Sequence, residues 1–304
     1  KDKLDEYIYG QTLEDLEYVE ERVEIIPGHI PITYNQKVAS IIKFFQNEGR
    51  SSFQKWLNRM SRYKPIILPI LEEEGVPPEL FYLAMIESGL NPKAYSYAHA
   101  SGVWQFISST GKIYGLKKNW WVDERRDIEK ATHAAARFLK DLYNEFDDWY
   151  LAFAAYNCGP SRVKKTIKRQ GTNDYWKLTR LPPQTRNYVA NIMAAIFISN
   201  NPAKYGFSLV KEKKMEWNIV EIDKAVSLQV ISECAKLDPS ILQNYNPELK
   251  QGTIPPIEKG KPYKFKMPID ASPEFDSLFA EVEIENIQEV LFLEHKVKRG
   301  ESLW

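Results

Sequence analysis

The sequence predicts a mainly α-helical chain that ends in a small α+β region. Between Asn35 and about residue 205, apolar residues recur with a helical period almost throughout. The pattern changes at the charged run 211–214. Beyond this run, the stretches 217–222 and 263–268 alternate apolar and polar residues, which is typical of short strands. We therefore expect a helical domain followed by a smaller mixed one.

Length and composition limit the class of protein. A chain of 304 residues with 43% hydrophobic residues is long enough for two domains with buried cores. Its 41 basic and 41 acidic residues balance, so no long-range field attracts nucleic acid and we expect no such partner. Two cysteines and four scattered histidines indicate neither a disulfide framework nor a metal site. Eight Trp and 17 Tyr are more than a core needs, which favours a binding surface.

The N-terminal segment, residues 1–34, is expected to form an arm that lies on the body of the protein. It combines mixed charge with the loop-like stretch 26–31, Ile-Pro-Gly-His-Ile-Pro. Its first six residues are mostly charged and cannot be the apolar core of a signal peptide. Either the protein is cytosolic, or a leader that was removed preceded this sequence.

Apolar stripes and helix-breaking residues divide the helical domain, residues 35–207, into separate helices. The longest stripe, 128–142, contains small alanines that predict a helix packed closely at the centre. Pro77-Pro78-Glu79 opens another helix, because a proline in the first turn removes no helical hydrogen bond. The remaining helices are expected from stripes at 38–45, 53–60 and 66–71 and from starts at Pro160 and Pro182-Pro183.

Residues 208–285 are expected to form the smaller domain, with the order strand, helix, helix, strand. Its two helices cover 227–235 and 241–245, between the alternating stretches. Residues 290–304 look like the opening of another such unit. The sequence therefore predicts a modular C-terminal region.

Glu87 is the strongest candidate for a catalytic residue. It follows the apolar helical stretch 83–86 and precedes Gly89, a helix stop. A carboxyl group there can face a cleft, and desolvation favours the protonated form that a general acid requires. A surface glutamate at a helix end is the plain alternative. The sequence has no nucleophile elbow or phosphate-binding loop, and Cys158 is expected to be a small buried thiol.

Four motifs in a fixed order favour the catalytic interpretation. They are Glu-Ser-Gly-Leu-Asn-Pro-Lys-Ala at 87–94, Ala-Ser-Gly-Val-Trp-Gln-Phe at 100–106, Ala-Ala-Tyr-Asn-Cys-Gly-Pro at 154–160 and Thr-Arg-Asn-Tyr-Val at 185–189. With this order and spacing, residues 60–200 strongly resemble the family 23 lytic transglycosylases. The resemblance implies a lysozyme-like helical catalytic domain of the goose-type, or SLT, class.

The C-terminal part has a second, weaker resemblance. Residues 297–304, Val-Lys-Arg-Gly-Glu-Ser-Leu-Trp, are similar to the first strand and turn of a LysM module, a peptidoglycan-binding fold. Residues 217–268 look like a degenerate LysM-like unit. A plain α+β spacer is an equal alternative for these residues.

The family resemblance implies cleavage of the β-1,4 bond between N-acetylmuramic acid and N-acetylglucosamine without water. Glu87 would protonate the glycosidic oxygen and then, as a base, take the proton of the muramic C6 hydroxyl. That oxygen would attack C1 and leave a 1,6-anhydro end. The acetamide of the substrate would stabilise the cationic centre, so that one carboxyl group suffices. The resemblance implies no metal and no organic cofactor.

By the same resemblance, five residues hold the substrate. Ser96 and Gln105 occupy the positions that hold the acetamido and sugar groups, and Tyr156, Asn157 and Tyr188 line the cleft beside the acid. From the residues alone, Ser96 is ordinary loop polarity. Tyr156 alone would be a core residue with its hydroxyl at the rim.

Two further positions bear on the site. Trp104 either stacks on a sugar or packs in the core, and the sequence does not decide between them. Gln184 stands where many members of the family have Glu, which removes a charge and any proton-transfer role at that position. We expect this change to alter the rate and not to abolish activity, because Glu87 is present.

Two other functions compete with the transglycosylase. A goose-type lysozyme-like muramidase would need a second carboxylate about 6.5–9.5 Å from Glu87 to activate water. Asp123, Asp127, Asp147 and Asp148 are available for this role. A non-catalytic peptidoglycan-binding protein would use LysM-like units for affinity and the helical domain as a scaffold. The joint presence of the acid and the substrate-binding residues argues against that function.

The resemblance also implies a partner and a location. The partner would be the glycan strands of peptidoglycan, and the location would be the periplasm or the outer membrane. We expect a leader with a lipid anchor to have been removed. The cysteine that would hold the lipid is not in this sequence.

Overall fold

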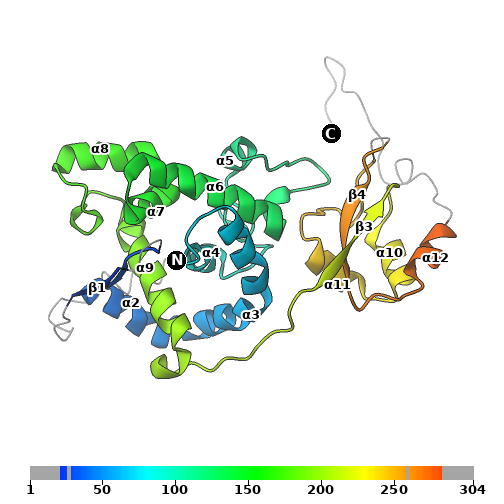
Figure 1. The fold of residues 1–304 in the computed structure, drawn as a ribbon, viewed down its shortest axis with the longest axis horizontal. Coiled ribbons are helices and arrows are strands. Elements are labelled where there is room, and N and C mark those ends of the chain that lie inside the picture. The colour runs from blue at the N-terminus through cyan, green and yellow to red at the C-terminus, as the bar shows by residue number, and fades with distance from the viewer. Residues whose placement is uncertain (1–20, 26–28, 258–259, 283–304) are drawn as a thin grey trace, which may run out of the picture. The chain divides into compact units, whose positions relative to one another are not determined.

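The computed structural model describes residues 21–25, 29–257 and 260–282 of the chain. These residues divide into two compact units (Figure 1). The first unit comprises residues up to Lys118 together with Glu124–Lys214, and the second comprises Asn119–Asp123 together with residues from Met215 onward. The unit expected to open at 290–304 lies outside the described residues.

The first unit is helical, so the predicted mainly α class is confirmed. A short antiparallel hairpin precedes the helices, with Arg22 opposite Tyr34. Figure 1 shows the helices of this unit in chain order, and two of them, α8 and α9, begin at predicted prolines. The elements of this unit are β1 (Arg22–Glu24), β2 (Ile32–Tyr34), α2 (Gln36–Gln46), α3 (Arg50–Glu73), α4 (Leu80–Ser88), α5 (Ser108–Ile113), α6 (Ile128–Phe146), α7 (Trp149–Cys158), α8 (Pro160–Gln170) and α9 (Pro183–Asn200).

The stripes at 53–60 and 66–71 lie on one helix and not on two. α3 continues for 24 residues through Pro65 and Pro69. Each proline inside a helix removes a hydrogen bond and costs about 3 kcal/mol. The helix persists because one face buries a row of apolar residues along its whole length. The apolar period therefore identified the buried face but not the continuity of the helix.

The hairpin strand β2 is tied to the helical body through Tyr150, at the start of α7. The Tyr150 hydroxyl donates to the backbone oxygen of Pro31 at 2.5 Å and lies 2.8 Å from Oγ1 of Thr33. Burial raises the pKa of Tyr150 to about 12. The phenol is therefore neutral at physiological pH and keeps its proton for this bond.

α4 is a buried helix in the middle of the first unit. All residues from Leu80 to Met85 are buried, as expected of a helix that is apolar on every side. α4 packs on α3 and α9, and Figure 1 shows α3, α6 and α9 around it. The helices packed on α4 therefore determine where its polar last turn, which contains Glu87, reaches the surface of the unit.

Aspartate side chains cap the two helices α6 and α7. Oδ1 of Asp127 accepts from the N–H groups of Glu129 and Lys130, each at 3.0 Å, and Oδ1 of Asp148 accepts from the N–H of Leu151 at 2.8 Å. The buried alanines of α6 let this helix pack closely on α3 and α7, as predicted.

The second unit has the predicted order strand, helix, helix, strand. Its strands pair antiparallel, with Trp217 opposite Pro268, and a further short helix follows that the sequence analysis did not predict. Apolar residues of both strands and all three helices form its core. The elements are β3 (Trp217–Ile222), α10 (Leu228–Ala235), α11 (Pro239–Tyr245), β4 (Tyr263–Pro268) and α12 (Phe275–Ala280).

A buried asparagine, Asn246, joins α11 to β4. Its Nδ2 donates to the backbone oxygens of Leu242 and Lys266, each at 3.0 Å, and its Oδ1 accepts from the N–H of Lys266 at 2.9 Å. The amide is fully buried. Because a buried amide costs free energy unless it is bonded, these three bonds favour a single arrangement of helix and strand.

The segment Asn119–Asp123, which the sequence analysis included in the helical domain, belongs to the second unit. Val122 forms an isolated antiparallel bridge with Leu249, and the N–H of Asp123 donates to the oxygen of Glu248 at 2.9 Å. A five-residue segment has no periodicity that could have indicated this pairing.

Gly89→Ala should destabilise the protein more than the matched change Gly171→Ala. Both glycines end a helix at positive φ, 61° and 66°, where an alanine costs about 1 kcal/mol. A Cβ on Gly89 would lie 2.2 Å from Nε1 of Trp56, whereas a Cβ on Gly171 meets nothing within 4 Å. We expect losses of about 3 and about 1 kcal/mol in the free energy of unfolding, measured with urea. Equal losses would show that the indole yields without cost.

The free energy of unfolding of the Asp148→Asn variant should increase relative to that of the parent chain as the pH rises. Burial, together with the charges of Asp174 and Asp147, raises the pKa of Asp148 above its ordinary 3.8. Ionisation of Asp148 therefore opposes folding, and this cost is absent below pH 3.8 and complete above the raised pKa. Asparagine caps a helix equally well and does not ionise. Urea unfolding between about pH 3 and about pH 7 measures the difference.

Asp238→Asn is the matched control with the opposite sign. Asp238 caps α11, and hydrogen bonds from Ser240 lower the pKa of Asp238. Ionisation of Asp238 therefore stabilises the fold, so this variant should lose stability relative to the parent as the pH rises. A pH dependence of the same sign for both variants would contradict the assignment for Asp148.

Candidate active site

Glu87 lies in the last turn of α4, where the helix leaves the core. Leu83, Ala84 and Met85 are fully buried, whereas Ile86 and Glu87 are half-buried. The sequence change from apolar to polar thus coincides with the surface of the unit. The carboxyl group is held on a rigid helix and remains accessible.

Several bonds determine how α4 ends. Gly89 adopts the left-handed conformation, and its N–H donates to the oxygen of Met85 at 2.8 Å. Nη1 of Arg59 donates to the oxygen of Gly89 at 2.9 Å. Oγ of Ser88 donates to the oxygen of Val103 at 2.8 Å, which links the helix end to the loop that follows.

The hydroxyl of Tyr188 donates a hydrogen bond to Oε1 of Glu87. Tyr188 comes from α9 and is 2% exposed. Burial, followed by the negative charge of Glu87, raises the pKa of Tyr188 well above its ordinary range. The phenol therefore keeps its proton and acts as the hydrogen-bond donor to Glu87.

Tyr156 is a second neutral phenol beside Glu87. It lies in the last turns of α7, and its hydroxyl donates to the backbone oxygen of Trp104 at 2.6 Å. Burial, and then the charge of Glu87, raise the pKa of Tyr156 well above its ordinary range. Three helices, α4, α7 and α9, thus bring Glu87, Tyr156 and Tyr188 together, although their motifs are far apart in the sequence.

A buried arginine shapes the loop that follows α4. Arg125 is 1% exposed, and its Nη1 donates to the backbone oxygens of His99 at 2.7 Å and Phe106 at 2.8 Å. The backbone oxygen of Arg125 lies so near Gly102 that a Cβ there would be 1.7 Å away. The sequence analysis missed Arg125, because in the run Glu124-Arg125-Arg126 nothing distinguishes it from a surface charge.

Ser96 and Gln105 belong to this loop and bond to its own backbone. Oγ of Ser96 accepts from the N–H of Ala100 at 3.1 Å. Gln105 has a φ of 52°, and its Nε2 donates to the oxygens of Gly102 at 2.8 Å and Ala94 at 3.3 Å. Both side chains are half-buried, so each shapes the loop while part of it stays open to solvent.

Asn157 joins α7 to α9. Its Oδ1 accepts from Oγ1 of Thr185 at 2.7 Å, so the motifs at 154–160 and 185–189 are bonded directly. Gln184, which departs from the family pattern, is half-buried in the first turn of α9. The predicted residues Tyr156, Asn157 and Tyr188 therefore lie on two helices that this contact holds in register.

Trp104 and Cys158 differ in how deeply they are buried. Trp104 is fully buried, and its Nε1 donates to Oγ1 of Thr132 at 2.9 Å, so it packs in the core and cannot stack on a sugar. Cys158 is half-buried and not buried as expected. Burial still raises the pKa of its thiol, so the thiol is a poor nucleophile at neutral pH.

Three of the four aspartates considered for a hydrolase have structural roles. Asp127 and Asp148 cap helices, and Asp147 ends α6 in the left-handed conformation. The fourth, Asp123, is buried in the second unit. None of these roles favours a water-activating carboxylate.

The described part of the chain offers neither a metal site nor a membrane-spanning helix. There, no group of three or more His, Cys, Asp or Glu side chains could hold a metal ion. Within the same residues, no helix is both long and apolar enough to span a membrane.

Known families match both units. Residues 65–179 match the model of the transglycosylase SLT domain, and residues 217–284 match that of the LysM-like domain of the lytic transglycosylase MltD. Glu87, Ser96, Gln105, Tyr156 and Asn157 lie within the first match. The second match favours the LysM-like interpretation of this region over a plain spacer.

Two curated relatives match different lengths of the chain. Membrane-bound lytic murein transglycosylase D of Escherichia coli K12 is 36% identical over 190 residues, which cover 60% of this chain and 42% of the relative. An Alteromonas protein named for tributyltin chloride resistance is 39% identical over 110 residues, 36% of this chain and 53% of the relative. The chain thus spans about half the length of the curated relatives it matches.

Among solved structures, the 70 kDa soluble lytic transglycosylase Slt70 of Escherichia coli has a TM-score of 0.41 and 20% identity, over 56% of this chain and 31% of that one. This similarity is too low to support an argument by itself. The helical first unit and the SLT match agree with the predicted lysozyme-like class. Residues 65–179 are therefore similar to the transglycosylase SLT family, and residues 217–284 are similar to the LysM-like domain of MltD.

Proposed function

We propose that this protein is a peptidoglycan lytic transglycosylase in which Glu87 is the single acid and base. The hydrogen bond from the neutral phenol of Tyr188 to Glu87 is the main support. It provides a donor to one carboxyl group at the end of a rigid, buried helix. The SLT match and the name of the Escherichia coli relative support the same reaction class.

The reaction that we propose needs one carboxyl group and no water. Protonated Glu87 donates its proton to the glycosidic oxygen as the bond from that oxygen to C1 of the muramic residue breaks. The resulting carboxylate takes the proton of the muramic C6 hydroxyl as that oxygen bonds to C1. One bond breaks, one forms, and Glu87 ends protonated, ready for another cycle. Tyr188 stabilises the carboxylate stage by donating to it.

The proposed substrate contacts come from both sides of Glu87. Ser96 and Gln105 would hold the acetamido and sugar groups from the loop after α4, which Arg125 keeps in shape. Tyr156 and Asn157 would contact the sugar from the end of α7. The LysM-like unit would bind glycan strands, and the site of action would be the cell envelope, as the names of the relatives suggest.

Glu87→Gln should abolish release of 1,6-anhydro-muropeptides from purified peptidoglycan, with a loss of about 1000-fold. The amide keeps the shape of the side chain but cannot donate and take back the proton. Mass spectrometry of the released fragments measures the product. The matched control Glu48→Gln changes an exposed glutamate in the same unit and should leave the release unchanged.

The same spectra separate the competing functions. Reducing ends that are one water heavier, released by the parent chain, would make the protein a hydrolase. No release by the parent chain would indicate a binding protein. In that case Gln184→Glu would test whether the departure from the family pattern is responsible.

Tyr188→Phe should lower kcat about 10- to 100-fold with little change in KM, because a hydrogen bond to a charged group contributes about 1.5–3 kcal/mol. Steady-state turnover of soluble glycan fragments measures both constants. Tyr82→Phe is the control, since Tyr82 is a buried phenol of α4 that donates to Oδ1 of Asn200 at 3.0 Å. Equal losses of kcat in the two variants would point to stability and not to Glu87.

A further inference from the structure

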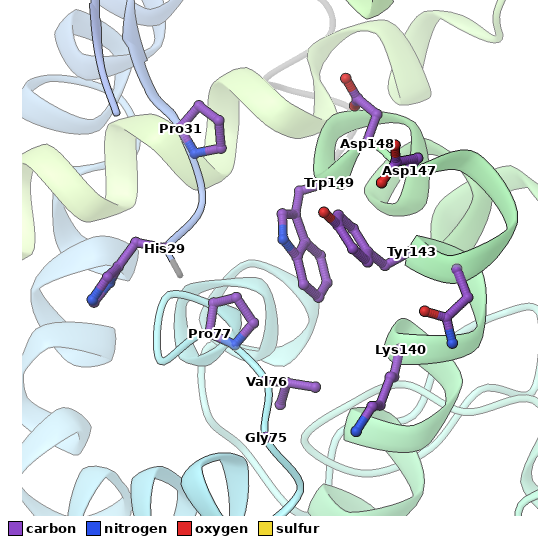
Figure 2. Close-up of a pocket in the computed structure, with 11 residues that line it drawn as sticks. His29, Pro31, Gly75, Val76, Pro77, Lys140, Tyr143, Asp147, Asp148 and Trp149 are labelled. Carbon is purple, nitrogen blue, oxygen red and sulfur yellow. The ribbon is translucent and has the colours of Figure 1, made fainter. Parts of the chain in front are cut away.

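A cavity of about 460 Å³ lies in the first unit, beside the start of α4 (Figure 2). Its size falls in the usual range for small-molecule sites. Its walls come from the loop before α4, the end of α6, the start of α7 and the segment before β2. Glu87 does not line it. Because Glu87 is seven residues beyond the start of α4, the cavity lies on the order of 10 Å from it along the helix axis.

Aromatic rings form the middle of one wall. Tyr143 and Trp149 are stacked, with ring centroids 4.4 Å apart and an angle of 23° between the rings. Figure 2 shows Pro31 and Pro77 across the cavity from the indole. The middle of the cavity is therefore apolar and suits an aliphatic part of a ligand.

Opposite charges occupy the two ends of the cavity. Figure 2 shows Asp147 and Asp148 at one end and Lys140 at the other, with the aromatic rings between them. His29 also lines the cavity, and its Nδ1 lies 2.6 Å from Oε1 of Glu79, so this ring nitrogen already has a partner. The cavity thus has one negative and one positive end.

Both ends can accept a charged group. Nζ of Lys140 donates to the backbone oxygen of Glu74 at 3.0 Å and has two further protons. Gly75 lies beside this ammonium, and a Cβ there would be in van der Waals contact with Nζ, at 3.7 Å. At the other end, burial and neighbouring acidic groups raise the pKa of Asp148, so a cation there would be stabilised.

We propose that this cavity binds the peptide part of peptidoglycan, with an ammonium group at Asp147 and Asp148, a carboxylate at Lys140 and an aliphatic segment on Trp149. A neutral sugar would use the aromatic wall but leave both charged ends unmatched. A short peptide with an amine and a carboxylate matches all three parts. This inference rests on the proposed function, because the glycan strands of peptidoglycan have such peptides attached.

Calorimetry with a peptide that contains no sugar tests the cavity directly. The probe is the N-acetylated tripeptide L-alanyl-γ-D-glutamyl-meso-diaminopimelic acid, which keeps a free amine and free carboxylates. Two further probes are the same peptide with its amine acetylated and with its carboxylates amidated. The parent chain should bind the acetylated and the amidated peptides about fivefold more weakly than the unmodified peptide. Acetylation removes the ion pair with the aspartates, and amidation removes the ion pair with Lys140.

Two variants remove one charge each. Asp147→Asn keeps a residue that tolerates the left-handed backbone, with φ of 52°, and should weaken the charged probe about fivefold without affecting the amine-acetylated one. Lys140→Gln should weaken binding of the charged probe about fivefold and should not affect binding of the amidated probe. Lys165→Gln, an exposed change on α8, is the matched control and should bind all three probes like the parent chain.

Each other outcome would overturn the inference. No binding of the charged probe, equal binding of all three probes, or equal weakening by Lys165→Gln and the cavity variants would each exclude a peptide site here. The peptide has no glycosidic bond, so the measurement does not depend on turnover. Failure of the cavity and failure of the proposed function are therefore observed separately.

Discussion

The candidate site depends on the way in which one buried helix ends. α4 is apolar on every side and is enclosed by its neighbours, so it can neither rotate nor slide without exposing core residues. Gly89 then turns the chain in a conformation that favours glycine, at a place where the indole of Trp56 leaves no room for a Cβ. The direction of Glu87 follows from these two constraints. The bonds from Arg59 to Gly89 and from Ser88 to Val103 hold the same helix end from outside.

Around this fixed carboxyl group, the fold provides hydrogen-bond donors that do not ionise. Burial keeps the phenols of Tyr156 and Tyr188 protonated. Tyr188 therefore donates a hydrogen bond to Glu87, and Tyr156 donates one to the backbone oxygen of Trp104. Such preorganised donors stabilise charge without reorganisation when it forms. The reaction that we propose uses the carboxyl group of Glu87 twice, and these donors would stabilise its negative charge at the carboxylate stage.

Contacts outside the motifs determine the shape of the surrounding loop and the extent of the units. The guanidinium of Arg125 bonds two backbone oxygens of the loop that contains Ser96 and Gln105. Its neighbours in the sequence, Asn119–Asp123, belong to the second unit, so one short stretch contributes to both bodies. The cavity with Trp149 is lined by the loop before α4, whereas Glu87 lies in the last turn of that helix.

The sequence by itself determined the mainly α class, the buried faces of the longer helices and the order strand, helix, helix, strand in the second unit, because these follow from the period of apolar residues. It did not predict α12. The motifs also predicted Glu87, Tyr156, Asn157 and Tyr188 as site residues, since their spacing resembles that of a known family, and the structure brings Glu87, Tyr156 and Tyr188 together. Only the tertiary structure decided that Trp104 is a core residue, that α3 continues through Pro65, and that Arg125 is buried. Each of these depends on which groups surround a side chain, and neither periodicity nor charge along the chain contains that information.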